Sequence, residues 1–186
     1  MRRKALAILC VVFLLSGCKK VDNPLGNAIG LRNKVLESNG CSFSATVTAD
    51  YGEKVYAFSM DCESDENGNL NFCVTKPGTI AGITGNISAA GGNLTFDDKV
   101  LAFQPLADGE ISPVTAPWLF MKTLRSGYIR SCTDSGDSYQ VEIDDSYAED
   151  ALRLLILIEN DLPVKGEIFW KGRRVIAIAV EHFIYL

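Results

Sequence analysis

The chain has a single histidine, His182, among its 186 residues. A Ser-His-Asp or Cys-His catalytic system would have to use this imidazole as its base. His182 lies two residues beyond an apolar run that ends at Val180. The simpler interpretation is therefore that His182 lies at the end of a strand or at the rim of the sheet. A hydrolase that uses two carboxylates on a glycan stays an open alternative, although no acidic pair stands out. We therefore expect a protein that is not an enzyme.

The sequence also lacks the usual signatures of cofactor and metal sites. Gly91-Gly92 stands alone in an expected hairpin bend and forms no phosphate-binding or dinucleotide motif. No two cysteines have the close spacing of zinc ligands. The segment from Glu63 to Gly68 is weakly similar to a calcium loop, but Val74 stands where the bidentate glutamate is needed. We expect no cofactor and no metal.

Positive charge is scarce in most of the chain. Of its 18 basic residues, three are Arg2, Arg3 and Lys4, and without them 15 basic residues face 23 acidic ones, a net charge of −8. An acidic surface without a basic stripe argues against nucleic acid as a partner. No later apolar segment reaches the roughly 20 residues of a spanning helix, and residues 151–158 predict a buried strand.

The first 18 residues have the pattern of an export signal. The basic residues 2–4 precede an apolar run that starts at Ala5, and the segment ends in Leu15-Ser16-Gly17-Cys18. This ending resembles the bacterial lipobox at every position. The resemblance implies cleavage of a signal peptide, residues 1–17, and attachment of a diacylglyceryl (palmitate-type) anchor to Cys18. The alternative is an ordinary signal peptide with a chance cysteine.

Residues 18–24 then form the lipidated cysteine and a short linker, and residues 25–186 form one domain. Apolar residues predict a helix over 25–38, and Pro117 is tolerated in the first turn of a second helix over 116–124. Alternation of apolar and polar residues begins at Cys41 and predicts about eleven strands. Because the connections between them are short, the strands are expected to pair antiparallel. They are expected at residues 41–48, 56–62, 70–74, 79–89, 93–97, 99–106, 127–133, 138–143, 151–158, 164–171 and 174–184.

The fold class is therefore mainly β (α+β). A generic antiparallel sheet or barrel is one interpretation. The sharper one is an incompletely closed half-barrel with the N-terminal and mid-chain helices on its concave face. The lipobox, this order of elements and the ending from Pro163 to Phe183 resemble the LolA/LolB-like lipoprotein carriers, and among them the clostridial germination lipoprotein S group.

Four cysteines follow Cys18, and export permits disulfides. If Tyr51-Gly52 is a two-residue hairpin loop, Cys41 faces Cys62 with the two Cα atoms about 4.5 Å apart, within disulfide range. We therefore predict a Cys41–Cys62 bridge. Cys73 could meet Cys132, or both could be free thiols.

Apolar residues should face inward from the curved sheet and from the mid-chain helix. They form either a solid core or, as the resemblance implies, the wall of an acyl-chain cavity beneath residues 116–124. The wall we expect is formed by Phe43, Val47, Phe58, Met60, Phe72, Leu94, Phe96, Phe103, Trp118, Phe120 and Leu124.

The leading hypothesis is a lipoprotein on the extracytoplasmic face of a bacterial membrane, which is the plasma membrane if the cell has only one. It would bind a lipid, an acyl chain or another apolar ligand. The rival is an adaptor that docks a cell-envelope protein, since the resemblance to the germination group implies a cell-wall amidase as partner.

Overall fold

The computed structural model describes residues 23–107 and 109–186. The predicted signal peptide and Cys18 lie outside these residues. The first described element is the helix α2, Pro24–Glu37, where the Asn23 side chain accepts a hydrogen bond from the Gly26 amide. No helix in this part of the chain is both long and apolar enough to cross a bilayer.

Eleven antiparallel strands form one open sheet in the order β6-β5-β4-β3-β2-β1-β13-β12-β11-β10-β9. The prediction of an eleven-stranded, unclosed half-barrel with two helices is therefore confirmed. The strands are β1 Gly40–Asp50, β2 Val55–Asp65, β3 Leu70–Lys76, β4 Thr84–Ser88, β5 Gly91–Phe96, β6 Lys99–Phe103, β9 Tyr128–Asp134, β10 Ser138–Asp144, β11 Arg153–Glu159, β12 Leu162–Trp170 and β13 Arg173–Tyr185.

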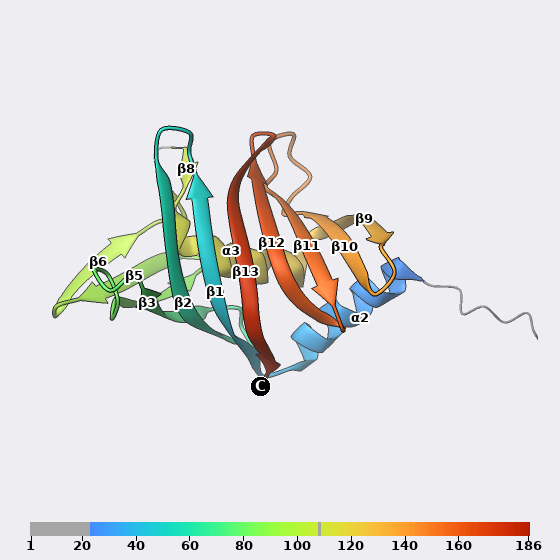
Figure 1. Ribbon diagram of the computed structural model, residues 1–186, viewed down its shortest axis with the longest axis horizontal. Helices are drawn as coiled ribbons and strands as arrows, with labels where there is room; N and C mark the ends of the chain where they lie inside the picture. The colour runs from blue at the N-terminus through green and yellow to red at the C-terminus, as the bar shows by residue number, and fades with distance from the viewer. Residues whose placement is uncertain (1–22, 108) are drawn as a thin grey trace, which may run out of the picture.

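The topology brings the two ends of the domain together at the middle of the sheet. Strand β1 pairs with both β2 and β13, so the N-terminal and C-terminal strands lie side by side (Figure 1). From there the sheet runs outward to two free edges, β6 and β9. A separate two-stranded hairpin, β7 Leu106–Ala107 with β8 Glu110–Ile111, was not predicted from the sequence.

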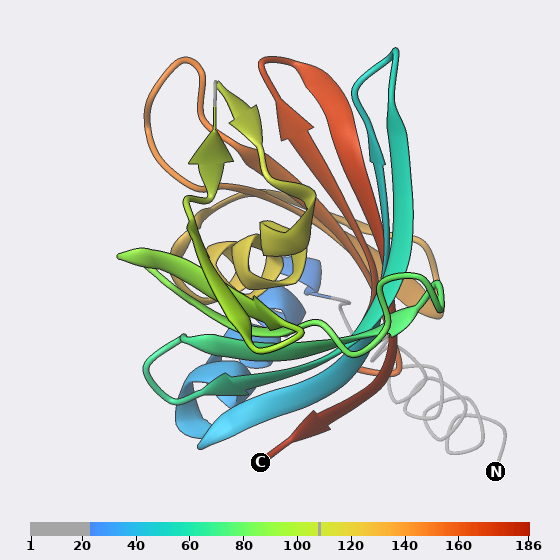
Figure 2. The same cartoon turned by 90° about the vertical axis from the view of Figure 1, so that its left-hand side faces the viewer.

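The link between the two free edges contains a 3-10 turn, η1 Pro113–Thr115, and the helix α3, Ala116–Ser126. Figure 2 shows α3 inside the curve of the sheet, with α2 beside it. Eight of the eleven α3 residues are buried, which explains why the helix is apolar nearly all round. The sheet and α3 thus enclose the core.

Polar contacts fix α3 at both ends. The Trp118 indole N–H donates to the Gly68 carbonyl oxygen at 3.0 Å. The Arg125 guanidinium donates to the carbonyl oxygens of Val35 and Glu66, at 3.3 and 2.6 Å. The helix is therefore tied to α2 and to the β2–β3 turn.

The predicted Cys41–Cys62 bridge is wrong because the β1–β2 loop is longer than assumed. The loop includes residues 51–54, and the Tyr51 amide donates to the Lys54 carbonyl oxygen at 3.0 Å. The register shifts by two residues, so Cys41 faces Ser64 and Cys62 faces Phe43. A shift of two keeps both side chains on the buried face. Cys41 and Cys62 are therefore diagonal neighbours across β1 and β2. All four cysteines of the described residues, Cys41, Cys62, Cys73 and Cys132, are free thiols.

The buried thiols of Cys41 and Cys62 should react slowly. Burial raises the pKa of Cys41, and burial together with Asp61 raises the pKa of Cys62 well above its usual range. Because the thiolate is the reacting form, alkylation of both in the native protein should be slow at pH 8 and should accelerate only at higher pH than for an ordinary thiol. Mass spectrometry of residues 19–186 after alkylation in denaturant without reductant should count four labels. A count of two, on Cys73 and Cys132 only, would restore the bridge.

Candidate functional site: an apolar hollow at one end of the half-barrel

Cross-strand pairing aligns the buried face of the sheet into continuous rows. One row passes from β1 to the free edge β6, and its residues become steadily more exposed along the way. Phe43 is 3% exposed, whereas Leu101 at the edge is 61% exposed. The row consists of Phe43, Cys62, Phe72, Gly85, Leu94 and Leu101.

Where this row leaves the core, the surface is hollowed to a volume of about 1040 Å³. Aromatic side chains of the β1–β2 hairpin form one wall, and the remaining apolar wall comes from the β3–β4 loop, β5, β8 and η1. Glu53, Lys54, Glu110 and Ser112 are the polar members of the lining. The apolar residues are Tyr51, Tyr56, Phe58, Ile80, Ile83, Leu94, Ile111, Pro113 and Val114.

A tyrosine joins the two walls. The Tyr51 hydroxyl donates a hydrogen bond to the Ile111 carbonyl oxygen, which links the β1–β2 loop to β8. The Tyr51 ring meets the Tyr56 ring edge-on, with the centroids 6.1 Å apart. Burial, with smaller contributions from Glu110 and Tyr56, raises the pKa of Tyr51 to about 12. The hydroxyl therefore stays protonated well above neutral pH, where an ordinary tyrosine would ionise, and keeps the hollow's two walls connected.

The sequence-predicted cavity residues fall into three groups. Phe58 and Leu94 line the hollow. Phe103 is half-buried against the core and Phe96 is 48% exposed. The others are at most 4% exposed and form packed core, namely Phe43, Val47, Met60, Phe72, Trp118, Phe120 and Leu124.

Alternation predicted the correct face for Phe96 but the wrong burial. Phe96 faces Lys99, and Leu101 faces Leu94, on the same side of the sheet as the core. Among the strands, α3 packs mainly against β2, β10, β12 and β13, and not against the edge strands β5 and β6. The apolar face of β5 and β6 is consequently left open next to the hollow.

The far wall of the hollow was not predicted from the sequence. Residues 79–89 were expected to form one strand, but the segment 77–83 is a turn and only β4 is extended. The turn brings Ile80 and Ile83 to the hollow. Gly82, with a φ of +89°, was the available signal for this turn.

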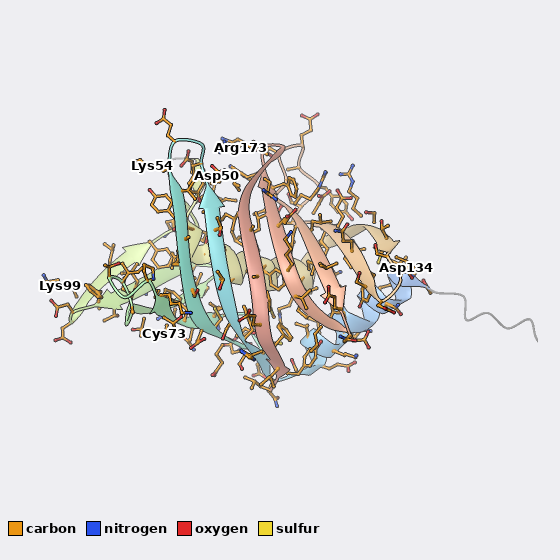
Figure 3. All side chains as sticks on the ribbon, in the orientation of Figure 1. Asp50, Lys54, Cys73, Lys99, Asp134 and Arg173 are labelled. Atoms are coloured by element: carbon orange, nitrogen blue, oxygen red, sulfur yellow. The ribbon has the colours of Figure 1, made fainter. Side chains whose placement is uncertain are left out.

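The charged side chains near the hollow lie on loops at one end of the strands. Asp50 ends β1, Lys54 belongs to the β1–β2 loop, and Arg173 starts β13 in the neighbouring hairpin (Figure 3). An Arg173 guanidinium N–H donates to the Asp50 carbonyl oxygen at 3.4 Å, which joins the two loops. The hollow is thus apolar inside, with both signs of charge at its mouth.

His182 is not part of this hollow. It has a φ of +55° at the β1–β13 bulge and lines a smaller depression of about 470 Å³ with Asp61 and Cys73. Among residues 23–107 and 109–186, no three His, Cys, Asp or Glu side chains are grouped to hold a metal ion. The arrangement at the main hollow is suited to binding by apolar contact.

Sequence comparison finds no family model and no curated protein that matches this chain. Solved structures do match. A putative outer-membrane lipoprotein-sorting protein domain from Vibrio parahaemolyticus has a TM-score of 0.50 at 9% identity, and the alignment covers 87% of this chain and 92% of that one. The fold is therefore that of the lipoprotein-sorting, LolA/LolB-like proteins, as the sequence resemblance predicted.

Two further structures match with lower scores. One is a LolA superfamily protein from Nitrosomonas europaea, at 9% identity and a TM-score of 0.46, covering 86% of this chain and 93% of that chain. The other is from the CwlD amidase of Clostridioides difficile in complex with the GerS lipoprotein, at 13% identity and a TM-score of 0.46, covering 90% and 99%.

Proposed function

We propose that this protein is a non-enzymatic lipoprotein, anchored through Cys18 on the extracytoplasmic face of a membrane, that binds an acyl chain or another apolar ligand. The observation that carries the proposal is the hollow between Tyr56, Leu94 and Val114, which opens onto the uncovered face of β5 and β6. Its volume of about 1040 Å³ is at the upper end of the usual range for small-ligand pockets, roughly 300–1,000 Å³.

Apolar burial would supply the affinity. Each Å² of apolar surface removed from water contributes about 25 cal/mol. The exposed Tyr56, Phe96 and Leu101 side chains, at 45%, 48% and 61%, offer such surface beside the hollow. A ligand with an apolar body would lie there, and its polar end would remain near Glu53 and Lys54 at the mouth.

Native mass spectrometry of residues 19–186, purified without detergent, tests this proposal. We expect a second species heavier by the mass of a lipid, and organic extraction should release that mass as an acyl compound. An apo mass alone, unchanged after incubation with fatty acids of different lengths, would contradict ligand binding.

A second candidate function, docking of a cell-envelope protein, is favoured by the packing around α3. Trp118, Phe120 and Leu124 fill the space where an acyl cavity was expected, and they are at most 4% exposed. A protein that only docks a partner needs no such cavity. An apo mass in the same experiment would favour this function.

A further inference from the structure

A second apolar surface lies at the other end of the molecule. Leu25 and Ile29 of α2 are 49% and 45% exposed, and the aromatic side chains of Tyr128 and Tyr147 are 43% and 83% exposed. The two tyrosine rings contact each other, with centroids 3.7 Å apart. These four residues, which we call the anchor-side patch, line one shallow hollow of about 620 Å³ together with Arg32 and Arg130.

The chain enters the domain at this patch. Helix α2 begins at Pro24, with Asn23 as its cap, and Leu25 is in its first turn. Cys18 precedes Asn23 by five residues, and an extended chain spans at most about 3.6 Å per residue, or roughly 18 Å in all. A lipid on Cys18 would therefore hold the start of α2 close to the bilayer surface.

We propose that the anchor-side patch rests on the bilayer interface and fixes the orientation of the domain. The inference rests on the proposed lipidation of Cys18. Tyrosine side chains favour the membrane–water interface because they have an apolar ring and a polar hydroxyl. Leu25 and Ile29 can bury apolar surface among the headgroups, next to the tyrosines.

The charges of this end fit a zwitterionic surface. Asp144 is paired with both Arg130, at 3.1 Å, and Arg153, at 3.0 Å. These pairs neutralise the carboxylate in the lining of the patch hollow. Glu149 and Asp150 lie in the same loop as Tyr147, so a strongly anionic bilayer would repel them. Phosphatidylcholine is therefore the suitable test surface.

This orientation has a consequence for the ligand hollow. Figure 1 shows the start of α2 and the strands β5 and β6 at opposite ends of the long axis of the molecule. Figure 3 shows the same separation between Lys99, the first residue of β6, and Asp134, the last residue of β9. With the anchor-side patch on the bilayer, the ligand hollow is held away from the membrane. Its ligand would then be exchanged with a carrier or substrate outside the membrane.

The test compares two tryptophan variants of the full-length protein, purified with its lipid and reconstituted in phosphatidylcholine vesicles with brominated acyl chains. Tyr147→Trp reports on the anchor-side patch, and Val100→Trp is the matched control, because Val100 is 69% exposed on the edge strand β6. The wild-type emission of Trp118 and Trp170 is subtracted. We expect quenching of the Tyr147→Trp signal to exceed that of Val100→Trp severalfold.

Two further measurements make the outcome decisive. Adding Leu25→Ser and Ile29→Ser to the Tyr147→Trp variant should reduce its quenching toward the control value. The mass of the N-terminal peptide from the same sample reports whether Cys18 is lipidated. A lipidated Cys18 with equal quenching of the two variants overturns the membrane contact alone, whereas an unlipidated Cys18 overturns both the anchor and this inference.

Discussion

Replacing Phe120 with alanine should lower the free energy of unfolding by about 3–5 kcal/mol, the usual cost of removing a buried phenylalanine ring. Phe120 is fully buried at the centre of α3, and its ring centroid lies 6.5 Å from that of Phe43 on β1. The truncation would leave a cavity between α3 and the sheet, which the tied ends of the helix prevent from closing. Urea unfolding followed by circular dichroism measures the change.

Gly166 on β12 provides an internal check of this contact. A Cβ atom at Gly166 would lie 2.7 Å from the Phe120 ring. Gly166→Ala should therefore cost about 1–3 kcal/mol through overpacking. In the Phe120→Ala background the added methyl group has room, so most of this cost should disappear. An equal cost in both backgrounds would mean that Phe120 does not pack on Gly166.

The exposed residue Phe96 is the control for the loss of an aromatic ring. Phe96 is 48% exposed on the edge of the sheet. Substitutions of surface residues usually change stability by less than about 0.5 kcal/mol. Phe96→Ala should stay within that range, and a loss similar to that of Phe120→Ala would contradict the burial described for these two rings.

The strands could be predicted because their residues alternate locally. In β1, Phe43 and Val47 are buried, whereas Thr46 and Thr48 are exposed, as expected for a strand with one buried face. The β2–β3 register was also predictable, since the Gly68 turn places Phe72 opposite Cys62 as observed. These features depend on residues close together in the chain.

The β1–β2 register and the hollow could not be predicted in the same way. The register depends on the hydrogen bond that closes the loop between Tyr51 and Lys54, and the pattern of apolar residues fits both registers because they differ by two. The hollow combines Tyr56, Ile83 and Val114, which come from separate parts of the chain. Alternation indicates which face a side chain occupies, but not whether a helix covers it.

Replacing Leu94 with aspartate should weaken binding of an acyl ligand by about tenfold or more, equivalent to at least ~1.4 kcal/mol. Leu94 is half-buried and lines the hollow from β5. The substitution removes apolar contact and places a carboxylate where a bound acyl chain would deprive it of water, which is costly for an unpaired charge. Tyr56→Asp, on the opposite wall and 45% exposed, should act in the same direction with less effect on folding.

Val100→Asp is the matched control for this substitution. Val100 pairs with Thr95 on the adjacent strand, so its side chain projects from the other face of the sheet edge, away from Leu94. The Val100→Asp substitution thus also adds a carboxylate near the edge of the sheet, but outside the hollow. Thermal unfolding of the variants separates a loss of affinity from a loss of fold.

The central claim, that the hollow binds an apolar ligand, is tested most directly by titrating a fluorescent fatty acid into delipidated residues 19–186. The wild-type protein and Val100→Asp should bind the probe saturably with similar affinity, and folded Leu94→Asp and Tyr56→Asp should bind it about tenfold more weakly or worse. The absence of saturable binding in the wild-type protein, or equal affinity in all four proteins, would contradict it.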